Sequence, residues 1–168
     1  MKSNTNKPFN PWKADRSPEL AGYTGRIFER EVLGECLIKA RGKVSFHSAL
    51  NAVFRHQPSD PCRPNGYQTV EFYNTVAYHM SALGMNPRRL QVYTAVGSAL
   101  DRWHGIDGFF SFEGALVTLD CTINPHKDSS RARVLVTAHD AFTGFHEAAI
   151  EVAFRFKDAI ECRVKGVV

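Results

Sequence analysis

Apolar residues recur every three or four positions along the first half of the chain, which is the spacing of an amphipathic helix. The pattern predicts helices over residues 23–41, 45–55 and 69–83. Gly42 is placed to end the first of them, and Gly84 with Pro87 to end the third. Residues 56–68 hold three prolines and a glycine, so a loop is expected there.

The second half of the chain changes to the shorter period of strands. Strands are predicted over residues 90–96, 107–112, 115–123, 133–138 and 160–165. Residues 143–158 return to helical spacing, with Thr143 as the expected N-cap. Strands interrupted by a helix predict an α/β fold, in which a mixed central sheet is flanked by helices. The helices of the first half would then be additions ahead of that core.

A chain of 168 residues is the size of one domain. We expect a single α/β domain over residues 21–168, preceded by an irregular basic arm over residues 1–20 that is rich in proline. Hydrophobic residues make up 43% and charged residues 23%, which excludes a disordered tail, a collagen-like fibre and a coiled coil. The net charge of +4 permits a polyanionic partner such as nucleic acid and does not require one.

The sequence also argues against several classes of protein. The four cysteines are far apart, so there is no CxxC motif, and we expect reduced thiols in a cytoplasmic protein. The N-terminus has no apolar region of the signal-peptide type, and no run approaches the ~18 apolar residues of a membrane helix. No membrane partner is therefore expected. Neither GxGxxG nor GxxxxGK occurs, so no nucleotide cofactor is expected.

The predicted hairpin carries two aspartates. If Phe112 pairs with Ala115 across the turn, Asp107 lies opposite Asp120, with Cβ atoms ~4.5–5.5 Å apart. The strand period of two puts both aspartates on one face, and a wholly apolar set of residues on the other.

Facing like charges are destabilising, and a divalent cation between them would remove the penalty. Mg²⁺ or Mn²⁺ is expected, because such hard cations take oxygen ligands. The backbone carbonyl of Cys121 is a candidate for a further ligand. The alternative is that Asp107 and Asp120 are simply solvated on an exposed sheet face.

These segments resemble the PD-(D/E)XK nuclease superfamily, which has the restriction-endonuclease-like fold. Its pattern is a helix, a strand with Asp, a hairpin strand with Asp or Glu and a Lys two residues on, a third strand, then a helix and a strand. Gly-Ile-Asp-Gly at 105–108 resembles the first acidic site and Leu-Asp-Cys-Thr at 119–122 the second. The resemblance covers residues 101–165, and the helix at 23–41 by its order. It implies a Mg²⁺-dependent nuclease that hydrolyses DNA phosphodiester bonds, and a homodimer is one expectation, because nucleases that cut both strands often dimerise.

The resemblance also implies roles for individual residues. The family commonly adds a Glu from its first helix. On a helical wheel Glu31 leans toward the body while Glu29 points elsewhere, so Glu31 is the candidate, followed by Glu35, and an exposed carboxylate is the alternative. The catalytic position of the family's Lys is occupied by Thr122, whose hydroxyl carries no positive charge. Lys127 is near enough in sequence to supply that charge, or it is an ordinary loop lysine.

Basic residues flank the predicted site. Contacts with DNA phosphates are expected from Lys127, Arg131, Arg133 and Arg102. A solvated charged surface is the other interpretation.

Two further functions stay open at this point. One is a catalytically inactive nuclease-fold protein that binds nucleic acid or a protein partner, which the absence of a Lys at position 122 favours. The other is a metal-dependent hydrolase of a small substrate.

Overall fold

The computed structural model describes residues 24–124, 127 and 130–165, so the predicted arm at 1–20 lies outside the described residues. A four-stranded sheet forms the centre of the fold, in the order β1–β2–β3–β4. The strands are β1 (Gln91–Thr94), β2 (Gly108–Phe112), β3 (Ala115–Thr122) and β4 (Val134–Thr137). β1, β2 and β3 pair antiparallel in turn, whereas β4 runs parallel to β3. The prediction of a mixed sheet in an α/β fold is therefore confirmed.

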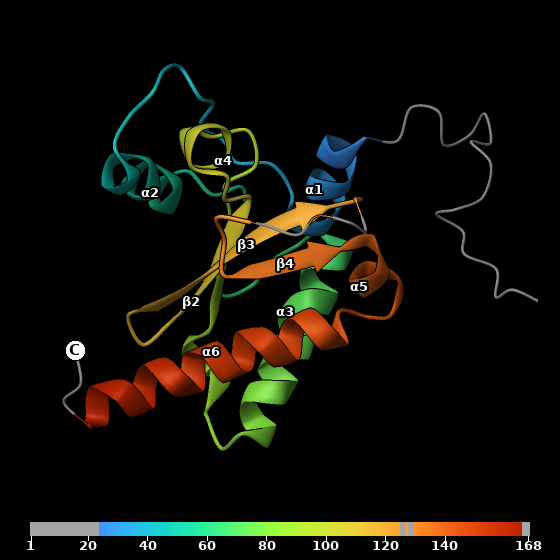
Figure 1. The fold of residues 1–168 in the computed structure, drawn as a ribbon, viewed down its shortest axis with the longest axis vertical. Coiled ribbons are helices and arrows are strands. Elements are labelled where there is room, and N and C mark those ends of the chain that lie inside the picture. Colours follow the sequence, from blue (N-terminus) through green and yellow to red (C-terminus); the bar gives the residue numbers. More distant parts are fainter. Residues whose placement is uncertain (1–23, 125–126, 128–129, 166–168) are drawn as a thin grey trace, which may run out of the picture.

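Helices cover both faces of this sheet (Figure 1). They are α1 (Gly25–Leu33), α2 (Phe46–Arg55), α3 (Tyr67–Ala82), α4 (Ala99–His104), α5 (Ala138–Phe142) and α6 (His146–Val164), with a short 3-10 helix, η1 (Pro87–Arg89). α1, α3 and α6 pack on one face, and α2 and α4 lie over the other (Figure 1). Within the described residues, none of these helices is both long enough and apolar enough to cross a membrane.

The strand period of two divides the sheet between two hydrophobic cores. Phe110 points into the larger core, where its ring meets Phe72 of α3 edge-on, at 5.1 Å between centroids. Its neighbour Phe109 points to the smaller core and stacks on Tyr93 at 4.9 Å. The predicted apolar face of the hairpin is confirmed as part of the larger core. The opposite face is also covered, because the α2 and α4 layer packs on it.

The first helix is much shorter than predicted. α1 ends at Leu33, and Gly34 follows with φ +75°, a left-handed conformation that suits glycine and stops a helix. The chain then leaves the helix: the backbone N–H of Cys36 donates to the Val96 carbonyl at 3.0 Å, and its thiol donates to the His56 carbonyl. Cys36 is apolar and buried because it enters the smaller core, not because it continues a helical stripe.

The last predicted strand is wrong. Residues 160–164 are the final turns of α6, and Ile160 packs against the larger core from there. Alternation over so short a run does not separate a strand from the exposed end of a helix. Thr143 is also not the N-cap of this helix. It ends α5, its N–H donating to the His139 and Asp140 carbonyls, and α6 begins after Phe145.

Candidate metal centre

The hairpin has the predicted register, and this places Asp107 at the start of β2. Phe112 pairs with Ala115 and Gly108 with Leu119. The Asp107 N–H donates to the Leu119 carbonyl at 2.9 Å. Its carboxylate Oδ2 accepts a 2.7 Å hydrogen bond from the backbone N–H of Cys121. Only 5% of Asp107 is exposed, so its carboxylate is held rigidly inside the protein.

Gly108 allows the first helix to approach this point closely. A Cβ at position 108 would lie 2.7 Å from the Tyr93 carbonyl oxygen and 2.8 Å from Leu33 Cδ1 at the end of α1. Neither distance is tolerated by a real side chain, so α1 and β1 can reach β2 only because position 108 has none. The close approach brings the carboxylate of Glu29, one turn before Leu33, toward Asp107.

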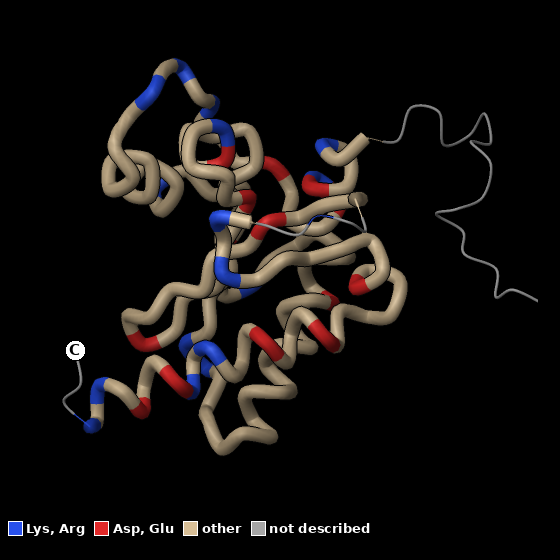
Figure 2. The backbone as a smooth tube through the Cα atoms, viewed as in Figure 1, with Lys and Arg blue, Asp and Glu red and all other residues tan. Residues whose placement is uncertain are grey.

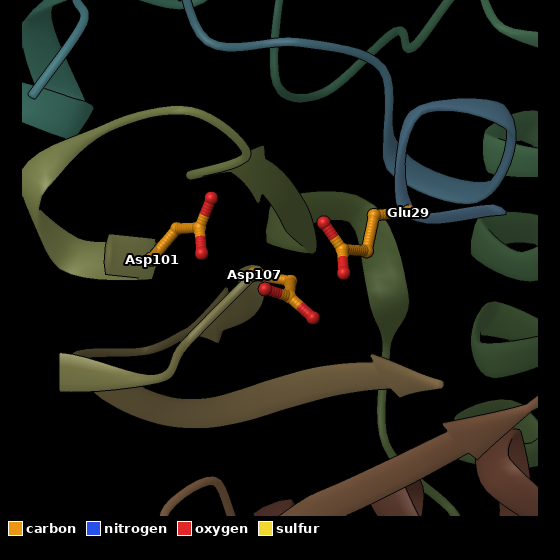
Figure 3. A group of neighbouring side chains, drawn as sticks. All are labelled: Glu29, Asp101 and Asp107. Atoms are coloured by element: carbon orange, nitrogen blue, oxygen red, sulfur yellow. The ribbon is translucent and has the colours of Figure 1, made fainter. Parts of the chain in front are cut away.

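Three carboxylates converge here from three elements: Glu29 of α1, Asp101 of α4 and Asp107 ahead of β2 (Figure 3). One oxygen from each lies within 4.8 Å of the others. The prediction that Glu29 points away is wrong, and Glu31 is exposed on α1. The prediction assumes a helix that continues to Ile38, whereas α1 ends at Leu33. The true α1 buries Val32 and Leu33, which follow Glu29 by three and four positions and so share its face.

Asp101 was missed by the sequence reasoning. It lies in the first turn of α4, three residues after the N-cap Ser98, where an acidic residue ordinarily serves helix capping. Its Oδ2 does accept a 2.7 Å hydrogen bond from the Gly97 N–H. This helix-capping role accounts for an acidic residue at position 101 and gives no sign of a second role in the carboxylate cluster. The same side chain is nevertheless turned toward Asp107 (Figure 3). The available signal was an acidic residue only six positions before Asp107.

Burial raises the pKa of all three carboxyl groups. The pKa of Asp107 is raised to about 8, first by burial and then by the charges of Glu29, Asp101 and Asp120, against the lowering effect of the Cys121 N–H. Burial is also the main cause that raises the pKa of Glu29 and of Asp101. A cation bound among these carboxylates would displace the protons that their raised pKa values favour.

Asp120 has a different environment. Lys127 Nζ donates to both of its carboxylate oxygens, at 2.8 and 2.6 Å, and Ser130 Oγ donates to Oδ2 at 2.7 Å. Asp120 is therefore not one of the three converging carboxylates, although its charge raises the pKa of Asp107. The alternative of two solvated aspartates is wrong, because Asp107 is 5% and Asp120 7% exposed.

The two residues that follow Asp120 have mainly local contacts. Thr122 is buried, and its Oγ1 accepts a hydrogen bond from the Asn124 N–H at 3.1 Å. The Cys121 thiol lies in the larger core, where burial raises its pKa well above the ordinary value. A Cys121 carbonyl ligand stays a prediction.

The predicted phosphate-binding arginines are exposed and gather partly around α4. Arg131 Nη1 donates to the Trp103 carbonyl at 3.2 Å, and the Arg102 guanidinium lies 5.9 Å from the centre of the Trp103 ring. Arg133 is exposed just before β4, with its backbone N–H donating to Thr118. Lys and Arg positions lie on α4, on the connection between α1 and α2, and ahead of β4 (Figure 2).

The chain is thus an α/β protein with a mixed four-stranded sheet, and it brings three carboxylates together at the start of β2. No protein-family model matches it, and no curated protein and no solved structure was found to be similar to it.

Proposed function

We propose that this protein is a Mg²⁺- or Mn²⁺-dependent nuclease that hydrolyses phosphodiester bonds of DNA. The observation that carries the proposal is the convergence of Glu29, Asp101 and Asp107, with Asp107 buried and its pKa raised to about 8. Gathering three carboxylates at one place, with Asp107 buried, is costly for folding alone, and perturbed groups of this kind concentrate at functional sites.

The donor set fits a hard divalent cation. Carboxylate oxygens are the ligands that Mg²⁺ prefers, and Mg²⁺ keeps several waters when one or a few carboxylates hold it. Glu29, Asp101 and Asp107 would hold it here. When bound, such an ion lowers the pKa of a coordinated water and neutralises charge on a phosphate. The protein residues contribute a fixed ligand geometry, since the Cys121 N–H holds Asp107 and the Gly97 N–H holds Asp101.

A positive charge lies next to this site in spite of Thr122. Lys127 reaches Asp120 on the neighbouring strand, and Ser130 contacts the same carboxylate. In the proposed role, Lys127 stabilises negative charge that develops on the phosphate, and Asp120 positions the Lys127 ammonium. This supports the resemblance to the PD-(D/E)XK pattern, in which a hairpin carries two acidic sites and a nearby lysine. Glu29 takes the part that the sequence had suggested for Glu31.

The order of elements supports the same proposal up to α6. A helix, a strand that follows Asp107, a hairpin strand with Asp120, a third strand and a helix succeed one another, as in the family pattern. The pattern's last strand is not found in the described residues, where α6 continues to Val164. The exposed Arg102, Arg131 and Arg133 supply positive charge for the phosphate backbone, with an affinity that falls as salt rises.

A second candidate is a protein of this fold that binds nucleic acid without cutting it. The contact between Lys127 and Asp120 favours this candidate, because it occupies the lysine ammonium that cleavage would need at the phosphate. Metal-independent binding through the arginines would then be the function.

The test is cleavage of labelled DNA by the purified protein with Mg²⁺ or Mn²⁺, comparing Glu29→Gln with Glu31→Gln. Both changes remove one carboxylate from α1, but only Glu29 lies in the cluster. We expect Glu29→Gln and Asp107→Asn to abolish cleavage while Glu31→Gln retains it. DNA binding without cleavage, unchanged by Glu29→Gln and by chelators, would instead establish the second candidate. Equal loss in both Glu variants would refute the assigned site.

A further inference from the structure

Two histidines meet where α3 and α6 pack together, on elements that contribute nothing to the carboxylate cluster. His79 lies in the last turn of α3 and His146 is the first residue of α6. His79 Nε2 and His146 Nδ1 are 3.4 Å apart, and the two rings are nearly perpendicular, at 82°. Both side chains are at least partly accessible to solvent.

The separation of these nitrogens matches that of two ligands on one zinc ion. Zn–N bonds of 2.0–2.1 Å at a tetrahedral angle place two ligand nitrogens about 3.3–3.4 Å apart. A hydrogen bond between the rings has the same length, so the distance is compatible with both arrangements. A shared ion would require both imidazoles to turn so that each lone pair faces it, which their solvent-accessible positions allow, and water would complete the coordination.

The surroundings favour neutral and ordered imidazoles. Burial and the neighbouring His146 lower the pKa of His79, which favours the neutral form that binds metals. Tyr78 packs edge-on against the His79 ring, at 5.1 Å between centroids. On the other side, Glu71 Oε1 and His146 Nε2 both lie within 3.9 Å of the place that a Cβ on Gly144 would occupy. A carboxylate there adds negative charge beside a cation and can orient the imidazole that binds it.

We propose that His79 and His146 form a binding site for Zn²⁺, or for another divalent ion that prefers imidazole, between α3 and α6. The two helices together cover the larger core, and Thr75 already ties α3 to the α6 connection through the Gly144 carbonyl at 3.2 Å. A metal ion held by one ligand from each helix would add a cross-link, so its binding free energy would stabilise the folded protein.

The test is titration of the full chain with Zn²⁺ against a chromophoric chelator, in buffer with millimolar Mg²⁺ to compete at the carboxylates. The variants are His79→Gln and His146→Gln, with His139→Gln on α5 as the matched control. We expect one Zn²⁺ site in the wild type and in the control. Each of the other variants is expected to lose about tenfold or more in affinity, at least the effect of losing an outer-shell partner.

Thermal unfolding supplies a second measurement, with circular dichroism checking that each variant is folded. Zn²⁺ should raise the Tm of the wild type and of His139→Gln, and should leave the Tm of His79→Gln nearly unchanged. The proposal is overturned if Zn²⁺ binds equally well to all variants. It is also overturned if Zn²⁺ binding disappears in Glu29→Gln but not in His79→Gln, since the ion would then occupy the carboxylates. Neither result depends on whether the protein cleaves DNA.

Discussion

Replacing Asp107 by Asn should stabilise the protein at neutral pH, although it removes a group from the proposed site. Asn has the same shape, and its side-chain oxygen can accept the hydrogen bond from the Cys121 N–H that Asp107 now accepts. What the variant lacks is a carboxyl whose pKa rises from 3.8 to about 8 on folding. Such a carboxyl holds its proton more tightly in the folded state, so unfolding releases a proton between these two pH values.

The sign and size of the effect follow from this linkage. Below pH about 4 the carboxyl is protonated in both states, and the wild type and Asp107→Asn should differ little. Between pH about 4 and about 8 the free energy of unfolding of the wild type falls by about 1.4 kcal/mol for each pH unit because of Asp107 alone. From pH 5 to pH 7 the wild type should therefore lose about 2.7 kcal/mol relative to Asp107→Asn.

The assay is urea unfolding at pH 5, 6 and 7 in the presence of a chelator. Asp120→Asn is the matched control, because Asp120 is ion-paired to Lys127 and its replacement should lower stability at pH 7. Mg²⁺ at pH 7 should stabilise the wild type and have little effect on Asp107→Asn. A parallel pH dependence of the wild type and Asp107→Asn would contradict a raised pKa of Asp107 in the folded state. So would an Asp107→Asn variant that is less stable than the wild type at pH 7.

Three further predictions follow from the packing. Gly108→Ala should destabilise the protein by about 1–3 kcal/mol in urea unfolding, because its Cβ would meet the Tyr93 carbonyl oxygen at 2.7 Å. It should also weaken metal binding, because α1 would have to move. A variant with the stability and metal affinity of the wild type would contradict this. Lys127→Met should cost about 1–3 kcal/mol at pH 7, since it leaves the buried Asp120 without its cation. A Lys127→Met variant as stable as the wild type in urea unfolding would contradict this. The thiol of Cys121 should react with a thiol reagent at pH 8 only after unfolding, because Cys121 is 3% exposed and burial raises the pKa of its thiol. Rapid modification of the folded protein would contradict the burial of Cys121 in the larger core.

Local patterns in the sequence determined the hairpin and its chemistry. Alternation of apolar residues predicted both strands, and the tight turn at Glu113–Gly114 set their register, because pairing on either side of a short turn leaves little freedom. That register placed Asp107 beside β3. Lys127 contacts Asp120 from only seven positions further along the chain.

The predictions from sequence are wrong where local and tertiary preferences compete. The apolar spacing around Cys36 resembles a continued helix, but Gly34 ends α1 and Cys36 enters the smaller core instead. The alternation of apolar and charged residues over 160–165 resembles a strand. Residues 160–164 instead form the exposed last turns of α6, from which Ile160 still packs against the larger core.

The composition of the candidate site was decided by the tertiary structure. The sequence alone predicted a pair of aspartates on one hairpin. Glu29 and Asp101 join Asp107 from helices that precede the hairpin, and apart from the short spacing between Asp101 and Asp107 no local pattern relates them to it. Their convergence depends on where α1 ends and on how closely it packs at Gly108, which are consequences of burying the two cores together. Short-range periodicity determines which residues a strand presents, whereas only the packing of distant elements determines which charges must share a buried space.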